Sequence, residues 1–99
     1  GKIDWKDSAE KIIGKINGLY PSPGAWFIYN GERYKILKAE ISNGIGKTGT
    51  VLNEYLEVSC NNNKSIKILE IQRQGKRKQK INEFMLGSQI KKGSILNNV

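Results

Sequence analysis

The residues with the clearest chemical potential in this chain are basic. Five of its 17 Lys and Arg residues fall between positions 73 and 80, namely Arg73, Lys76, Arg77, Lys78 and Lys80. Because Lys and Arg neutralise phosphates, a cluster of this density is typical of a site for a polyanion such as a nucleic acid. Gly75, inside the cluster, either relaxes the backbone where it meets a phosphate or serves a turn. The competing interpretation is a solvated loop or a disordered basic tail.

The excess positive charge lies in the last third of the chain. Seventeen basic and nine acidic residues give a formal net charge of +8. Residues 1–63 contain eight bases and seven acids, a net of +1, whereas residues 64–92 contain nine bases and two acids, a net of +7. The cluster lies between a strand-like run and a helix-like run, so we expect a folded connection to hold it in place. Lys35 and Lys38, on a predicted outward strand face, are possible secondary contacts.

Several classes of chemistry are excluded by composition. The chain has no histidine, which excludes Ser-His-Asp and Cys-His nucleophiles and His-ligated metal sites. Cys60 is the only cysteine, which excludes an intrachain disulfide and favours a reducing, cytoplasmic compartment. Its alternation with polar neighbours predicts a small core residue and not a nucleophile. We therefore expect no catalytic residue, no metal and no cofactor in this chain. No apolar run is long enough to span a membrane, and no predicted helix carries both a basic face and a large aromatic face, so we expect no membrane partner.

The elements that must position the basic cluster begin with a helix. Residues 7–20 have the apolar spacing of an amphipathic helix that ends at a proline. Asp7 and Glu10 stand in capping-box positions, and Ser8 is a competing N-cap. Residues 42–49 are expected to form a flexible, glycine-containing loop that departs from a phosphate-binding loop in its first glycine and lacks the following helix.

Short strands account for most of the remaining chain. They are predicted over residues 25–29, 33–41, 50–53, 55–60 and 65–72, and Asn30-Gly31 is a strong hairpin signal between the first two. A short helix over 81–86 ends at Gly87, with Phe84 and Met85 as packing residues, and an irregular tail is anchored by Ile95 and Leu96. The pattern predicts one mainly β domain over residues 1–99, a small OB-like β-barrel with flanking helices, of a type whose outer face binds oligonucleotides. Its parts are a leading segment 3–20, barrel strands 25–72, a basic loop 73–80, a short helix 81–87 and a tail 88–99.

Four aromatic side chains are further candidates for contact with nucleic-acid bases. Trp5, Trp26, Tyr29 and Tyr34 could each stack on a base. Packing in the core or between domains is the favoured interpretation for each of them, so none is assigned to a site.

An ordered set of motifs resembles a known domain family. Residues 3–5, 21–25 and 33–39 resemble the start of the C-terminal domain of methionyl-tRNA formyltransferase. Residues 49–52, 71–78 and 82–87 resemble that family's Pro-Gly-Thr step, its Leu-Gln-x-x-Gly-Lys segment and the short helix that ends in Phe-Leu-x-Gly. The chain departs from the family pattern at Tyr20 and Ser22, where Asn and Trp are frequent, and at Thr48, where Pro is usual.

The resemblance implies a fragment of a bacterial enzyme of translation initiation. The family's catalytic domain is N-terminal, binds 10-formyltetrahydrofolate and uses an Asn, a His and an Asp. The absence of histidine agrees with the expectation that this domain is missing. The implied role is to bind initiator methionyl-tRNA and position it for formylation by that catalytic domain. We expect the isolated chain to be a monomer that transfers no formyl group. Two alternatives stay open: a packing or substrate-positioning module of a formyltransferase with a non-tRNA substrate, and a free-standing nucleic-acid-binding OB-like domain.

Overall fold

The leading helix is fixed by a serine cap. The computed structural model describes residues 1–96, and helix α1 (Ala9–Leu19) begins after Ser8, whose Oγ accepts a hydrogen bond from the Lys11 amide at 3.1 Å. The predicted capping box from Asp7 is therefore wrong. Asp7 instead lies one residue before the cap, where its carboxylate is 3.5 Å from the Lys11 ammonium. The predicted apolar stripe is confirmed, because α1 buries Ala9, Ile12 and Ile16.

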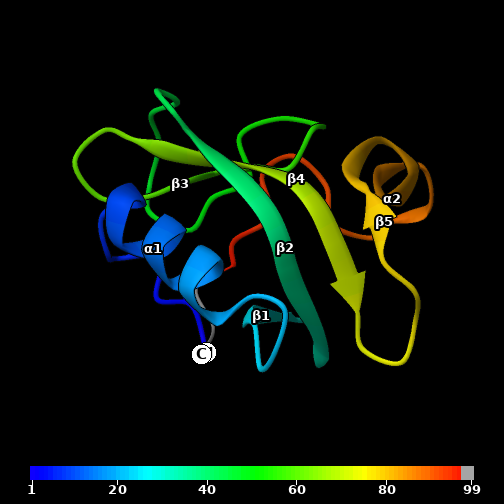
Figure 1. Cartoon of the computed structure of the whole chain (residues 1–99). Coiled ribbons are helices and arrows are strands. Elements are labelled where there is room, and N and C mark those ends of the chain that lie inside the picture. The colour runs from blue at the N-terminus through cyan, green and yellow to red at the C-terminus, as the bar shows by residue number, and fades with distance from the viewer. Residues whose placement is uncertain (97–99) are drawn as a thin grey trace.

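The sheet contains five antiparallel strands that curl into a half-barrel (Figure 1). Their bounds are β1 (Ala25–Tyr29), β2 (Glu32–Ser42), β3 (Glu57–Ser59), β4 (Ser65–Arg73) and β5 (Gln79–Lys80). The strand order is β1-β2-β4-β3, and β5 pairs with the end of β4. Together with α1 and the short helix α2 (Ile81–Gly87), this confirms the predicted mainly β, OB-like architecture.

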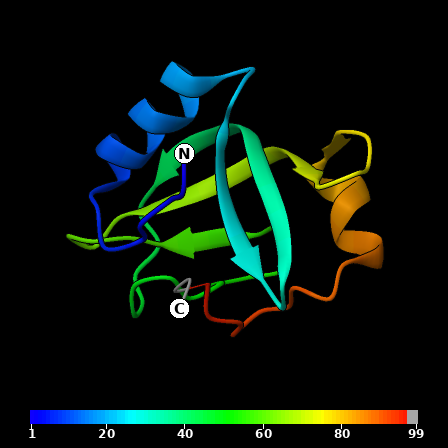
Figure 2. The same ribbon diagram turned by 90° about the horizontal axis from the view of Figure 1, so that it is seen from below.

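The β1–β2 hairpin and an irregularity in β2 follow from local sequence. Asn30 and Gly31 have φ values of 49° and 77°, which the primed hairpin turn requires, so the predicted turn is confirmed. Farther along β2, the register against β4 shifts on both sides of Lys38. Bulges of this kind increase the bend of a strand, which fits the curved path of β2 across the sheet (Figures 1 and 2).

Two predicted strands are wrong or shorter than expected. No strand forms over 50–53: Thr50 and Val51 make only isolated bridges, to Ile95 and Val58 respectively. This segment is bonded on one side to the tail, where the Val51 amide donates to the Ser94 carbonyl oxygen, and on the other side to β3, where the Leu52 amide donates to the Glu57 carbonyl oxygen. The strand predicted over 55–60 is reduced to β3 because Leu56 has a φ of 59°, which interrupts extended backbone.

The tail is anchored differently from the prediction. Leu96 is buried as expected, but Ile95 is 46% exposed. Ile90, which the sequence did not single out, is fully buried and provides the second apolar anchor. Predicted tail positions 97–99 lie outside the described residues.

The core is organised by a row of aromatic rings. Trp5 meets Phe27 edge-on at 6.0 Å, Phe27 stacks on Tyr34 at 5.4 Å, and Tyr34 meets Phe84 of α2 edge-on at 5.7 Å. This row ties the leading segment to the short C-terminal helix through the sheet. Cys60 is 3% exposed, which confirms it as a core residue, and burial raises the pKa of its thiol to about 12.

Candidate nucleic-acid interface

The basic cluster lies on a short connection that backbone hydrogen bonds close. Arg73 is the last residue of β4, and Gln79 and Lys80 form β5, so the loop spans 74–78 and is shorter than the predicted 73–80. The Lys76 amide donates to the Arg73 carbonyl oxygen at 2.9 Å. The Gln72 side-chain amide donates to the Lys76 carbonyl oxygen at 2.9 Å. Gly75, at a φ of 78°, makes the turn that these bonds require.

Four of the five predicted residues present their charges to solvent. Lys76, Arg77, Lys78 and Lys80 are all exposed, and none takes part in the two ion pairs found among residues 1–96. We call these four residues the free basic set. Close packing of unpaired like charges is unfavourable, and a polyanion would relieve it.

Arg73 differs from the free basic set because it already has an acidic partner. Its Nη2 lies 2.8 Å from Glu32 Oε1 and its Nε lies 3.0 Å from Glu32 Oε2, a two-point contact between β4 and the start of β2. The hydrogen bond from Arg73 holds the pKa of Glu32 below its usual value, and the bond to Glu32 raises the pKa of Arg73. At neutral pH the negative charge of Glu32 therefore offsets the positive charge of Arg73, one of the five predicted binding residues.

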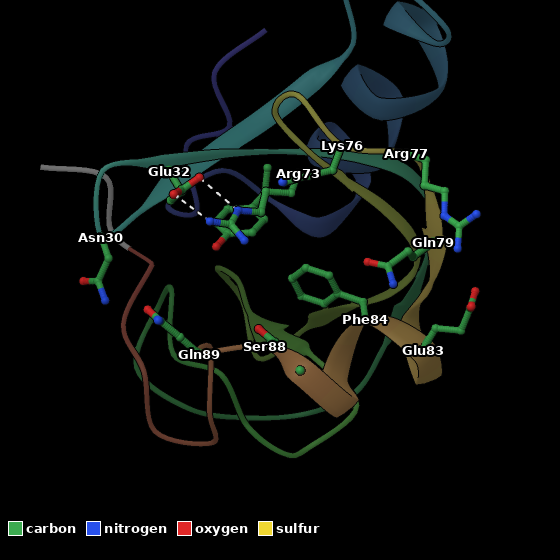
Figure 3. Close-up of a pocket in the computed structure, with 12 residues that line it drawn as sticks. Asn30, Glu32, Arg73, Lys76, Arg77, Gln79, Glu83, Phe84, Ser88 and Gln89 are labelled. Atoms are coloured by element: carbon green, nitrogen blue, oxygen red, sulfur yellow. Dashed lines mark hydrogen bonds and ion pairs between the residues drawn. The ribbon is translucent and has the colours of Figure 1, made fainter.

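A cavity of about 470 Å³ opens between the loop and α2 (Figure 3). The Arg73–Glu32 pair forms one wall, and the Phe84 ring points toward the space from α2. Lys76 and Arg77 lie at the rim, but Glu32 and Glu83 also line the cavity. Because three bases face two acids here, this cavity attracts a phosphate less than the exposed side of the loop does.

The two secondary candidates lie on β2 at different distances from the loop. Lys35 is half-buried and lines a smaller hollow together with Gln74 and Gly75 of the loop. Lys38 is exposed, and its Cα pairs with Glu70, which in turn pairs with Lys80 of β5. The structure therefore brings Lys35 beside the loop and places Lys38 in the same cross-strand row as Lys80, separated from it by an acid.

One basic residue beside the loop was missed by sequence reasoning. Arg33 is exposed, and its guanidinium carbon lies 3.7 Å from the centroid of the Trp26 ring. The Gln74 amide donates to the Arg33 carbonyl oxygen at 2.9 Å, which joins β2 directly to the loop. The available signal was strand alternation, because Arg33 and Lys35 are two positions apart and share a face.

The aromatic candidates divide into two groups. Trp5 and Tyr34 are buried in the core, as the favoured interpretation predicted. Trp26 and Tyr29 are half-buried, and the Tyr29 hydroxyl lies 3.3 Å from Ser94 Oγ in the tail. Trp26 is therefore the tryptophan that remains partly accessible from outside the sheet.

Two further features limit the chemistry of the described residues. Within residues 1–96, no three Cys, Asp or Glu side chains gather closely enough to hold a metal ion. Neither helix in that part of the chain is both long and apolar enough to cross a lipid bilayer.

Comparison with known proteins identifies the family. A family model described as the C-terminal domain of formyl transferases matches residues 1–89. The methionyl-tRNA formyltransferase of Pelagibacter ubique is 68% identical over 99 residues, which cover all of this chain and 32% of the relative. The methionyl-tRNA formyltransferases of Paramagnetospirillum magneticum and Caldanaerobacter subterraneus are 38% and 43% identical, each over 97% of this chain. They are covered over 31% and 32% of their own length, so the chain spans about a third of these relatives.

The match agrees with the resemblance carried by the sequence motifs. The family model covers the leading segment, the sheet, the basic loop and α2, which are the segments in which the motifs lie. The predicted resemblance is thus confirmed, and the chain belongs to the formyl transferase C-terminal domain family.

Proposed function

We propose that this domain binds initiator methionyl-tRNA through the free basic set and positions it for N-formylation by a separate catalytic domain. The observation that carries the proposal is the exposure of four unpaired bases on a loop held by hydrogen bonds. Such residues neutralise backbone phosphates and release counterions, which gives affinity and orientation without reading bases. The relatives are methionyl-tRNA formyltransferases, and their name indicates the RNA and the reaction.

The segment before α1 is bonded to β1. The Trp26 amide donates to the Gly1 carbonyl oxygen at 2.9 Å, and the Ile3 amide donates to the Trp26 carbonyl oxygen at 2.8 Å. Trp26 lines the same hollow as Gln74 and Gly75 of the basic loop. The segment Gly1–Ile3 therefore lies along β1, the strand that carries Trp26.

We assign the formyl-transfer reaction to the separate catalytic domain. No histidine is present, and burial raises the pKa of the Cys60 thiol far above neutrality, so neither group offers a base or nucleophile here. We assign 10-formyltetrahydrofolate and the catalytic residues to the preceding domain. The isolated chain should then show no formyl transfer, and turnover by this chain alone would overturn that division of roles.

The test is a titration of the domain with initiator tRNA and with bulk tRNA at about 50 and about 200 mM salt. Affinity that depends on phosphate contacts falls strongly over this range. One variant replaces the free basic set, Lys76, Arg77, Lys78 and Lys80, with Ala. Its matched control removes the same charge elsewhere, at the exposed residues Lys6, Lys47, Lys67 and Lys92, which take part in neither ion pair.

The expected result follows from counterion release. Each phosphate contact on duplex RNA contributes about 0.9 to the slope of log affinity against log salt, so loss of four contacts lowers the slope by up to about 3.6. The control should retain most of the slope. If the loop variant binds tRNA as tightly and with the same salt response as the parent, or if the control loses as much, the loop is not the site.

A further inference from the structure

The outer face of the β1–β2 hairpin carries a stacked pair of side chains next to the basic loop. Trp26 of β1 pairs in register with Lys35 of β2, and Arg33 lies two positions before Lys35 on the same face. The Arg33 guanidinium carbon is 3.7 Å from the Trp26 ring centroid, the geometry of a cation–π contact. Arg33 is exposed, whereas Trp26 and Lys35 are half-buried. The indole thus supports the guanidinium from the protein side.

The stacked pair forms part of a hollow of about 260 Å³ that lacks acidic residues. Its wall includes Trp26, Arg33 and Lys35 from the hairpin and Gln72, Gln74 and Gly75 from β4 and the loop. Arg73 also lines it, but its charge is matched by Glu32. Arg33 and Lys35 therefore leave the hollow with two uncompensated positive charges, whereas two acids line the larger cavity beside α2. A ligand with a phosphate is favoured in the smaller hollow.

The backbone around this hollow is held in place. The Arg33 carbonyl oxygen accepts from the Gln74 amide, which fixes the loop against β2. The Trp26 amide and carbonyl are both bonded to the segment Gly1–Ile3, which fixes the other side. A Cβ built on Gly75 would meet no atom within 4 Å, so the loop side is open to a ligand.

We infer that Arg33, Trp26 and Lys35 form a subsite for a single unpaired nucleotide. The base lies flat on the outer face of the guanidinium, because a planar guanidinium can stack on an aromatic ring on each side. The Lys35 ammonium pairs with the phosphate of that nucleotide. The subsite deepens the proposed function and rests on it, because the neighbouring free basic set would bring the RNA strand to the hollow.

The test separates base contact from phosphate contact by changing the ligand. Binding of the 99-residue chain is measured for an eight-nucleotide adenine RNA strand and for an abasic strand of the same length and charge. The parent should prefer the strand with bases, since base stacking contributes between about 5-fold and 150-fold in affinity per base. Equal affinity for the two strands would refute the subsite.

Arg33→Lys is the diagnostic variant because it keeps the charge and removes the planar group. It should abolish most of the preference for the base-containing strand while leaving affinity for the abasic strand within about twofold, since the phosphate term depends on charge. Lys47→Arg is the matched control, because it also exchanges one basic group for another, at an exposed position outside the hollow and the free basic set, and it should keep the preference. Retention of the preference in Arg33→Lys, with unchanged thermal unfolding, would refute the assignment.

Binding of free adenosine monophosphate shows whether the subsite takes free nucleotides or only nucleotides within a strand. Saturable binding of the free nucleotide that Arg33→Lys weakens supports a subsite for free nucleotides as well as for strands. Binding of strands alone, with the same dependence on Arg33, supports a subsite that acts only beside the loop phosphates.

The two proposals fail in different ways. If the loop variant loses tRNA affinity but the strands with and without bases bind equally, the subsite is wrong and the tRNA-binding loop stands. If the base preference depends on Arg33 but tRNA binding does not depend on the loop, the subsite stands and the proposed tRNA-binding loop is wrong.

Discussion

The ion pair between Arg73 and Glu32 controls how much positive charge the basic loop offers to RNA. Glu32→Gln removes the acid and leaves Arg73 free at the end of β4, next to Lys76 and Arg77. Because the pair is exposed on both sides, with side chains 45% and 41% accessible, its loss should not disturb the core. The expected effect is therefore a gain in affinity for tRNA without a change in fold.

The magnitude follows from the number of available charges. If the free basic set makes four phosphate contacts, the slope of log affinity against log salt is about 3.6, and affinity falls by about 150-fold between 50 and 200 mM salt. With Arg73 released as a fifth contact, the slope becomes about 4.5 and the fall becomes about 500-fold. The Glu32→Gln variant should therefore bind tRNA more tightly than the parent at low salt. Its fall in affinity over the same salt range should be about 3.5-fold larger than the parent's.

Two other variants separate this effect from a general change in charge. Glu40→Gln removes an exposed acid toward the other end of β2 and should leave the slope unchanged. Arg73→Gln should cost little affinity, because Glu32 already neutralises that guanidinium. Fluorescence anisotropy of labelled tRNA at several salt concentrations measures all three slopes. If Glu32→Gln behaves like Glu40→Gln, or if Arg73→Gln loses as much affinity as Lys76→Gln, Arg73 is not withheld from the ligand.

Three further predictions concern the scaffold. Gly44→Ala should destabilise the fold by about 1–3 kcal/mol in denaturant titration, because its Cβ would lie 2.5 Å from Glu57 Oε2. Burial alone would raise the pKa of Glu57, but hydrogen bonds from Ser65, Asn53 and Ser42 outweigh burial and lower that pKa. The ionised carboxylate therefore stabilises the fold fully above about pH 4.5. This stabilisation is lost as the pH falls through the lowered pKa. Glu57→Gln should cost about 2–3 kcal/mol at pH 7 and flatten the acid limb of stability; an unchanged acid limb would contradict this. The Cys60 thiol, with its pKa raised to about 12, should react with a disulfide reagent at pH 8 only after unfolding.

Local sequence patterns predicted the elements whose formation depends on neighbouring residues. The apolar stripe of α1, the Asn30-Gly31 turn and the strand predicted over 65–72 depend on neighbouring residues, and all three are present in the structure. The strand expected over 50–53 is reduced to two isolated bridges, one to Val58 of β3 and one to Ile95 in the tail, more than 40 residues away, and no local pattern reveals the second partner. Strand β5 was missed for the same reason, since it exists only by pairing with Glu70 and Ile71 of β4.

The candidate site likewise combines a feature that is local in the sequence with contacts between residues far apart in it. The density of bases between 73 and 80 is a local property, and the loop 74–78 lies inside that stretch. The Glu32 contact to Arg73 joins residues 41 positions apart, so the reduced availability of Arg73 could not be read from the sequence. The glycines of the 42–49 loop also have a tertiary explanation, because Gly44 and Gly46 leave room for Glu57 and the Leu52 side chain.

Strand alternation in β2 explains why one side of the molecule is better suited to a polyanion. Glu32 and Tyr34 face the cavity beside α2, where the carboxylate holds Arg73 and the phenol ring contacts Phe84. Arg33 and Lys35, the residues between and after them, face the opposite hollow with no acid in its wall. A period of two along four residues therefore places Glu32 on one side of β2 and Arg33 and Lys35 on the other. Because Tyr34 also stacks on Phe27 in the core, the register that separates these charges is fixed by packing. A one-residue slip would bury Arg33 and Lys35, so the arrangement of charge is as strongly specified as the core itself.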